Sequence, residues 1–267
     1  MTKLPSLNLK ALTVRVFALA LLVSPLLAMA GEEGAAMESA QIDLTDKASL
    51  QRGAALYMNY CSGCHSLNYQ RYSRMGEDLG LTEDEVKQNL MLSPEAKIGE
   101  TMNTGMDPAK ATLWLGKAPP DLSVEARTKE AGADWIYNYL KSFYVDEARP
   151  LGWNNTVFPG ASMPHVLWEM QGVQHAVTEP RHGDEPCAKG EFQGQCIVGF
   201  QIPESQKGTL DAEQYDRVAR DLSAFLAYTG EPSATHRESI GVWVVLFLAF
   251  FTLLAYLLKA EYWRDVH

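Results

Sequence analysis

The segment Cys61-Ser62-Gly63-Cys64-His65 constrains the fold of this 267-residue chain more than any other feature. Two cysteines separated by two residues and followed by histidine form the C-x-x-C-H signature of covalent haem attachment. This spacing lets both thiols reach the two vinyl groups on one edge of a porphyrin, while the histidine presents its imidazole to the iron. We therefore expect one covalent haem c, bound through Cys61 and Cys64, with His65 as an axial ligand.

Two other interpretations of a C-x-x-C pair have different requirements. A thioredoxin-like redox pair would follow a strand, and a zinc half-site would need two more ligands nearby. The residues before the motif instead have helical periodicity, because Leu50, Ala54, Tyr57 and Cys61 recur at spacings of four, three and four. This pattern predicts a helix that begins at Asp46 and delivers Cys61 at its end.

The amino-terminal residues 1–30 have the features of a secretory signal peptide. Basic Lys3, Lys10 and Arg15 accompany an apolar run that ends in an A-x-A cleavage sequence. The alternative is a first membrane span, but the apolar run is short and contains Pro25. We therefore predict that residues 1–30 are removed on export.

A second apolar segment, residues 240–258, predicts a membrane anchor. It contains no charge over nineteen residues, and a helix rising 1.5 Å per residue would nearly cross a hydrocarbon core of roughly 30 Å. We expect residues 31–235 to form a periplasmic haem domain and residues 236–267 a carboxyl-terminal transmembrane anchor with a short cytoplasmic tail. The expected location is the bacterial inner membrane, in a single pass.

The charge balance argues against nucleic acid as a partner. The chain has a formal net charge of −10, and removal of the signal peptide, with three basic residues and no acidic one, changes it to −13. Such a surface repels phosphate backbones and favours a cationic partner. Solubility alone would also explain it.

Further helical patterns occur along the exported region. Residues 133–144 carry apolar side chains on one face, and residues 211–228 form the strongest amphipathic pattern in the chain. Thr82 and Glu85 have the spacing of a capping box, in which each side chain satisfies a backbone N–H at a helix start. These segments predict three further helices.

The remaining regions lack regular periodicity. Residues 31–45 predict a poorly ordered lead-in, and residues 93–124 contain so many Pro and Gly residues that we expect a long loop. Residues 197–202 weakly predict a small hairpin. The expected fold class is mainly α, a class I cytochrome c-like haem domain with long loops plus one carboxyl-terminal transmembrane helix.

A cytochrome iron needs a sixth ligand from a distant part of the chain, and Met163 is the best candidate. It lies between Pro159 and Pro164 in a stiff loop of small residues, and a thioether raises the reduction potential relative to an imidazole. Met163 could instead fill the core, as many methionines do. His165 is the competing ligand, and the residues alone leave both open.

Cys187 and Cys196 remain after haem attachment. In an oxidising compartment we expect them to form a disulfide. It would close a loop of about ten residues and stabilise the fold by roughly 2 to 3 kcal/mol in the entropy model. Two free thiols are the alternative.

Several segments carry a more specific resemblance. They are the residues 61–67 with Tyr69 and Tyr72, the residues 81–87, the residues 118–123 with Arg127 and Asp134, Met163-Pro164, and the residues 221–226 that lead through Glu231-Pro232 to the anchor. In these segments the chain resembles the cytochrome c1 family, the haem-bearing subunits of the cytochrome bc1 complex, or quinol to cytochrome c oxidoreductase. The resemblance covers nearly the whole mature chain.

The resemblance implies roles for particular residues. It places Met163 as the axial ligand, Arg127 near a haem propionate, and the Pro119-Pro120 turn against the proximal side of the haem. A main-chain carbonyl of that turn, at Pro120, would orient His65 through its Nδ1–H. The family often has Ala-Pro-Pro after its methionine, where this chain has Pro164-His165.

The resemblance also implies a function. The chain would accept an electron from a Rieske iron–sulfur protein and pass it to a soluble cytochrome c, alongside cytochrome b in a dimeric complex. No catalytic residue is expected, because the chain is an electron carrier within a larger oxidoreductase. The alternatives are a stand-alone membrane-anchored monohaem cytochrome that donates to a terminal oxidase or reductase, and a haem-based sensor with an open sixth position.

Overall fold

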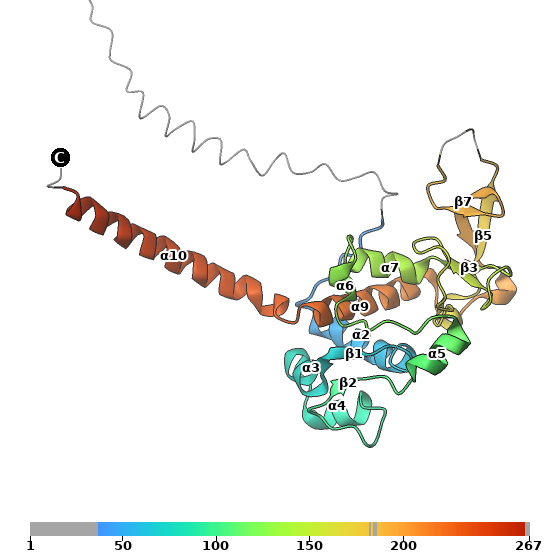
Figure 1. The fold of residues 1–267 in the computed structure, drawn as a ribbon, viewed down its shortest axis with the longest axis horizontal. Coiled ribbons are helices and arrows are strands. Elements are labelled where there is room, and N and C mark those ends of the chain that lie inside the picture. Colours follow the sequence, from blue (N-terminus) through green and yellow to red (C-terminus); the bar gives the residue numbers. More distant parts are fainter. Residues whose placement is uncertain (1–36, 182, 184–185, 265–267) are drawn as a thin grey trace, which may run out of the picture. The chain divides into compact units, whose positions relative to one another are not determined.

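The computed structural model describes residues 37–181, 183 and 186–264 (Figure 1). The predicted signal peptide, residues 1–30, lies outside the described residues. The part of the predicted lead-in that is described contacts the body of the domain. Ala40 is buried, and Ile42 and Leu44 pack against the core. The start of the described chain is therefore attached to the domain.

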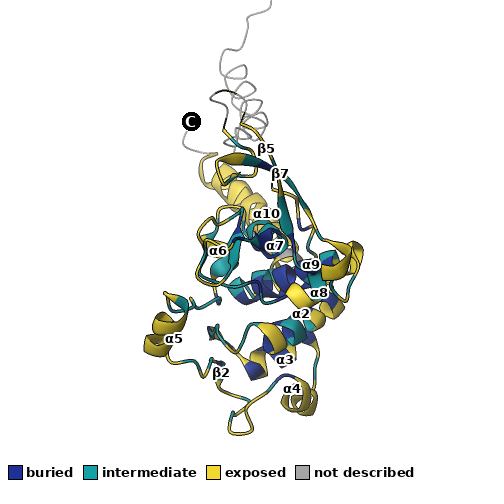
Figure 2. Cartoon of the chain, turned by 90° about the vertical axis from the view of Figure 1, so that its right-hand side faces the viewer, coloured by how far each residue is buried: buried dark blue, intermediate teal, exposed yellow. Residues whose placement is uncertain are grey.

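Three helices form the centre of the domain. Helix α9 (Ala212–Gly230) packs against both α2 (Lys47–Tyr60) and α7 (Ala133–Lys141). Figure 2 shows that buried residues are concentrated in these helices, among them Phe225 and Tyr57, whose rings lie 5.7 Å apart. The predictions of helices from Asp46 and over residues 211–228 are confirmed, because the apolar spacing in each matches the face that is buried.

Side chains at the helix starts satisfy backbone N–H groups that have no partner within the helix. The Asp46 carboxylate accepts hydrogen bonds from two backbone N–H groups of the first turn of α2. Thr82 and Glu85 form the predicted capping box at α4 (Glu83–Asn89). Asp211 forms a second capping box with Gln214, which was not predicted, at α9.

Helices α2 and α9 approach each other closely at Gly53. A Cβ atom added there would lie 2.2 Å from the backbone oxygen of Asp221 and 2.7 Å from Cβ of Phe225. The buried Asp221 carboxylate also accepts hydrogen bonds from Ser49 Oγ at 2.5 Å and Arg52 Nε at 2.7 Å. Contacts at Gly53 and at the residues before it thus hold α2 against α9.

The prediction of one long loop over residues 93–124 is partly wrong. This region contains strand β2 (Thr101–Met102) and helix α5 (Pro108–Leu115). Pro108 occupies the first turn of α5 behind the N-cap Asp107, and Gly116 ends the helix with a φ of 78°. Pro and Gly here mark the two ends of a helix, rather than preventing it.

The prediction of a helix over residues 133–144 is correct only as far as Lys141. Residues Phe143–Val145 form strand β3, which pairs with β4 (Trp153–Asn155). Phe143, the first residue of β3, is fully buried. A buried residue just beyond a helix continues its apolar spacing, so the pattern does not reveal where the helix ends.

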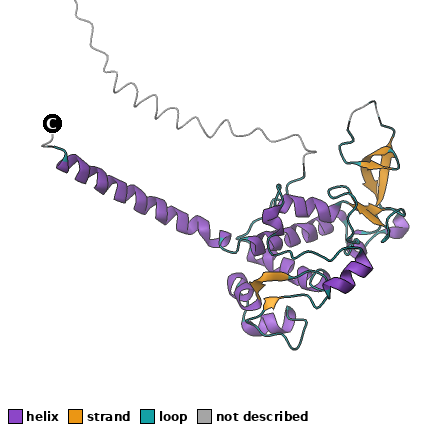
Figure 3. Ribbon diagram, in the orientation of Figure 1, coloured by secondary structure: helices purple, strands orange, loops and turns teal. Residues whose placement is uncertain are grey.

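The other strands are short, as Figure 3 shows. Strand β1 (Leu67–Arg71) pairs with β2, and a three-stranded antiparallel sheet has the order β5 (His175–Glu179), β7 (Gln195–Gln201), β6 (Glu191–Phe192). The predicted hairpin within residues 197–202 is wrong, because residues up to Gln201 form the single strand β7, which pairs with β5 and β6. The described residues before the anchor helix also form α3 (Tyr72–Leu79), α6 (Glu125–Thr128), α8 (Trp168–Gln171) and the 3-10 turn η2 (Glu204–Gln206).

Helix α10 (Ala234–Tyr262) contains the predicted membrane span. Within it, Ile240–Tyr262 is long and apolar enough to cross a membrane, with a mean hydropathy of 2.5, and none of this segment is buried in the protein. Exposed Phe and Leu side chains along a whole helix need an apolar environment. The described part of the chain therefore ends in a single-pass membrane anchor.

We predict that Gly53→Ala lowers the free energy of unfolding by about 2 kcal/mol, because its Cβ overlaps the α9 backbone. Urea unfolding of the haem-loaded protein would measure this. Gly99→Ala is the matched control, since a Cβ there meets nothing within 4 Å. Greater stability of Gly53→Ala, as expected from helix propensity alone, would contradict the close contact.

Candidate functional site

The C-x-x-C-H segment forms a tight turn at the end of α2. The N–H of Cys61 donates to Tyr57 O at 2.8 Å, and the N–H groups of Cys64 and His65 donate back to Cys61 O at 3.0 and 2.9 Å. Both cysteines are free thiols and half-buried. The turn thus presents two thiols and an imidazole from one short segment.

Burial affects both thiols of the motif. Burial, with a smaller contribution from Cys64, raises the pKa of Cys61 to about 12, and burial also raises the pKa of Cys64. Reactive redox pairs have the opposite property, a lowered thiol pKa. The helix before the motif argues against the thioredoxin-like interpretation, which requires a strand there.

The imidazole of His65 is oriented by a main-chain carbonyl. Its Nδ1 lies 2.8 Å from Pro120 O, so Nδ1 carries the proton and donates to that oxygen. Burial lowers the pKa of His65, and this outweighs the opposite effect of the Pro120 hydrogen bond. A neutral ring with its proton on Nδ1 leaves the lone pair of Nε2 for a metal, as is usual for ligating histidines.

Neighbouring loops hold the turn in place. Tyr57 Oη donates to His65 O at 2.6 Å. Thr104 bonds twice, through its Oγ1 to Gly63 O at 2.8 Å and through its N–H to Ser66 Oγ at 2.9 Å. The turn is thereby attached both to its own helix and to the segment before α5.

A cavity of about 170 Å³ lies beside Cys64, with Met106, Ala111 and Pro119 among its lining residues. The larger cavity, about 320 Å³, lies against the disulfide-bonded cysteines, away from the C-x-x-C-H turn. The donor set at the turn fits haem c: two free thiols and a neutral imidazole with an available Nε2. When bound there, the haem supplies reversible one-electron transfer at its iron.

The two candidate sixth ligands lie in different environments. Met163 is half-buried in an irregular loop between β4 and α8. His165 is only 2% exposed, and its ring stacks on Phe143 with centroids 5.0 Å apart. Burial lowers the pKa of His165 to about 4, so the ring is neutral at physiological pH.

Arg127 lies on α6 and is exposed. Its guanidinium forms an ion pair with Glu231 at 2.5 Å, and Glu231 also pairs with Arg237 at the start of α10. The predicted propionate partner therefore already has a carboxylate partner near the beginning of the anchor helix.

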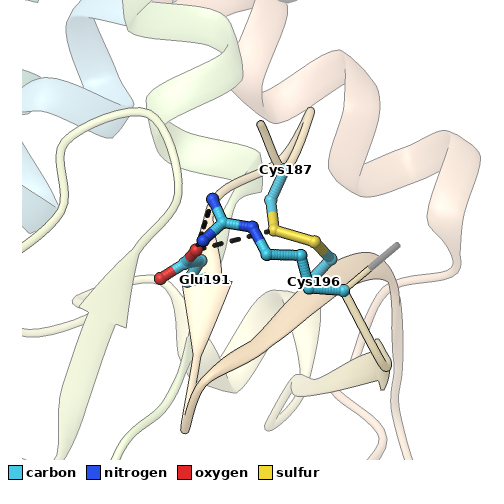
Figure 4. Close-up of a disulfide and its surroundings, with 4 residues drawn as sticks. Cys187, Glu191 and Cys196 are labelled. Atoms are coloured by element: carbon cyan, nitrogen blue, oxygen red, sulfur yellow. Dashed lines mark hydrogen bonds and ion pairs between the residues drawn. A yellow bond between two sulfur atoms is a disulfide. The ribbon is translucent and has the colours of Figure 1, made fainter. Parts of the chain in front are cut away.

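Cys187 and Cys196 form the predicted disulfide, with their Cα atoms 5.1 Å apart (Figure 4). Glu191 lies beside it, with Oε1 at 3.9 Å from Cys187 Sγ, and pairs with Arg181 at 2.9 Å. The disulfide connects the segment before β6 to β7, and the ion pair connects Arg181 to β6 itself.

Sequence reasoning missed two contributors to the site. It assigned Tyr57 to the core face of α2 but did not predict its hydrogen bond to the His65 carbonyl. Thr104, which bonds to the turn from the presumed loop, was missed entirely. A Tyr placed one helical turn before Cys61 was the available signal, whereas nothing local marks Thr104.

Sequence comparison identifies the family. Residues 38–180 and 205–266 match the Cytochrome C1 family. The chain belongs to the cytochrome c1 family. The matched residues include the whole C-x-x-C-H turn and the anchor, whereas the disulfide-bonded Cys187 and Cys196 lie in the unmatched segment between them.

The sequence alignments with individual relatives cover most of this chain. Cytochrome c1 of Allochromatium vinosum is 47% identical over 254 residues, which cover 94% of this chain and 98% of the relative. A Nitrosomonas europaea protein named ammonia monooxygenase gamma subunit is 39% identical over 254 residues, 95% of this chain and 99% of that protein. Cytochrome b/c1 of Bradyrhizobium diazoefficiens is 26% identical over 251 residues, 83% of this chain and 34% of the relative.

Membership of the cytochrome c1 family establishes the cofactor and the general role. Members carry one covalent haem c and are the electron-transfer haem subunits of the bc1 oxidoreductase. The chain is thus an electron carrier with a single-pass carboxyl-terminal anchor. Its mainly helical haem domain agrees with the predicted fold class.

We predict that Tyr57→Phe lowers the free energy of unfolding by about 1 to 2 kcal/mol, because the His65 carbonyl loses its donor in a partly buried position. Urea unfolding followed by haem absorbance would measure it. Tyr60→Phe is the control, since Tyr60 is 38% exposed, and should change stability by less than about 0.5 kcal/mol. Equal effects would mean that the hydrogen bond contributes nothing.

Proposed function

We propose that the haem is bound through Cys61 and Cys64, with His65 and Met163 as the axial ligands of the iron. The observation that carries this proposal is the hydrogen bond from His65 Nδ1 to the Pro120 carbonyl, 2.8 Å long, beside two free thiols. A ligating histidine needs such a partner to fix its tautomer and the direction of Nε2.

Met163 is favoured over His165 as the sixth ligand. The His165 ring is enclosed by aromatic side chains of the protein itself, with Phe143 across one face. Reaching the iron would require the imidazole to leave this packing. Met163 lies in a half-buried loop, and its thioether gives the higher reduction potential that suits an electron donor to a c-type cytochrome.

Arg127 and Pro120 have supporting roles in this proposal. Pro120 contributes its carbonyl to His65, as above. Arg127 would pair with a haem propionate. Its guanidinium has five N–H donors, so it can bind a propionate in addition to the Glu231 carboxylate. Both residues precede the Met163 loop in the chain.

The proposed path takes an electron from the Rieske iron–sulfur protein and passes it to a soluble c-type cytochrome. The excess of acidic side chains, including Glu83, Asp84 and Glu85 at the start of α4, favours a cationic acceptor by long-range attraction. The protein contributes the ligands, and the cofactor undergoes the redox change.

Cytochrome b is the proposed partner of the anchor, in a dimeric complex. The relative named cytochrome b/c1 has about three times the length that this chain matches, and its name joins the two subunits. The signal peptide, residues 1–30, would export the haem domain, residues 31–235. The anchor, residues 236–267, would then hold it on the periplasmic side of the bacterial inner membrane.

A membrane purification tests this proposal. After solubilisation in mild detergent, the tagged chain should copurify with a cytochrome b and a Rieske protein, and this complex should reduce a soluble cytochrome c with quinol. A complex whose activity resists a cytochrome b inhibitor would contradict the proposed path. Isolation of the chain alone, or with a terminal oxidase, would instead support the stand-alone cytochrome.

A further inference from the structure

His165 is enclosed by three aromatic side chains from different elements. Phe143 of β3 stacks on it with an interplanar angle of 6°, and Trp153 of β4 meets it edge-on, with centroids 5.2 Å apart. Tyr215 of α9 packs at 6.5 Å, also edge-on. We call these three residues the aromatic cage. It ties the segment after Met163 to the central helix and to the β3–β4 pair.

Two buried polar atoms near the cage have no hydrogen-bond partner within the described part of the chain. His165 Nε2 is buried and has no hydrogen-bond partner among the described residues, and the same is true of Gln171 Oε1. The Gln171 amide nitrogen lies 3.3 Å from Lys141 O and 3.3 Å from Gln174 Oε1, so its carbonyl oxygen remains to accept. The Gln171 side chain lies near the His165 ring. Each buried atom is the natural partner of the other.

The position of His165 restricts that of Met163. The two residues are separated only by Pro164, whose ring fixes its own φ. Two residues of extended chain span at most about 7 Å. A side chain fixed at His165 therefore leaves the Met163 backbone little freedom to move.

We propose that His165 is a positioning residue, which clamps the carboxyl side of the loop in the aromatic cage and so holds the Met163 thioether at the haem iron. This inference rests on the proposed assignment of Met163 as the axial ligand. Thioether sulfur is a weak ligand that outside ligands displace when its loop moves. Function of such a site requires the ligand to be held within about 0.5 Å by its supporting residues.

The test uses the full-length haem-loaded protein in detergent and three variants: His165→Phe, Gln171→Leu and the double variant. Each single variant removes one of the two buried polar groups and keeps the other, whereas the double variant replaces both with apolar groups. The matched control is His175→Asn, which alters a second histidine–glutamine pair, His175 Nε2 with Gln206 Oε1 at 2.6 Å, outside the loop. The readouts are the rate of cyanide binding to the ferric protein, the sulfur-to-iron charge-transfer band and the covalent haem content.

Each single variant should keep its full haem content, bind cyanide about tenfold faster and have a weakened charge-transfer band. The double variant should return toward the wild type, and His175→Asn should match the wild type. Wild-type cyanide rates in both single variants would overturn the inference. If His165→Phe incorporates no haem, the cyanide rate of Gln171→Leu decides the test, because this variant keeps the imidazole in the cage. A faster rate supports the inference, and a wild-type rate overturns it.

Met163→Leu separates failure of this inference from failure of the ligand assignment. If the wild type has the charge-transfer band and Met163→Leu lacks it, the assignment stands, and the cyanide rates alone decide the role of His165. If the band persists in Met163→Leu, the assignment fails and the inference fails with it. If the wild type lacks the band and has a bis-histidine spectrum, which Met163→Leu keeps and His165→Phe loses, His165 is the ligand.

Discussion

The close contact of α2 with α9 at Gly53 is the constraint on which the site depends. A Cβ at Gly53 would lie 2.2 Å from the Asp221 backbone oxygen, so the two helices meet with no side chain between them. The C-x-x-C-H turn begins one residue after α2 ends. This contact therefore fixes the position of the turn relative to the central helix of the domain.

The two axial sides of the proposed haem site are supported in different ways. On the His65 side, two side chains donate hydrogen bonds to main-chain carbonyls, His65 Nδ1 to Pro120 O and Tyr57 Oη to His65 O. On the Met163 side, it uses packing, because His165 is held by aromatic rings. Hydrogen bonds fix the direction of an imidazole, whereas packing restrains a loop whose thioether ligand has no donor and only a weak acceptor.

Chemistry carried by adjacent residues could be predicted from the sequence. The C-x-x-C-H turn, the Thr82–Glu85 capping box and the amphipathic face of α9 depend on spacings within a few residues. The partner of His65 could not be derived in this way, because Pro120 is 55 residues away, and only the family resemblance indicated it. Strand β3 and helix α5 were misread, since pairing across the chain and the role of Pro108 as a helix start are not visible in apolar spacing.

The most direct test of the account is mass spectrometry of the mature protein after trypsin digestion and thiol alkylation. Arg52 and Arg71 flank the motif, so cleavage releases residues 53–71 as one peptide. The account predicts that this peptide carries the mass of one haem, that neither Cys61 nor Cys64 is alkylated, and that no other peptide carries haem. Recovery of the peptide with both cysteines alkylated, or of haem on another peptide, would contradict it.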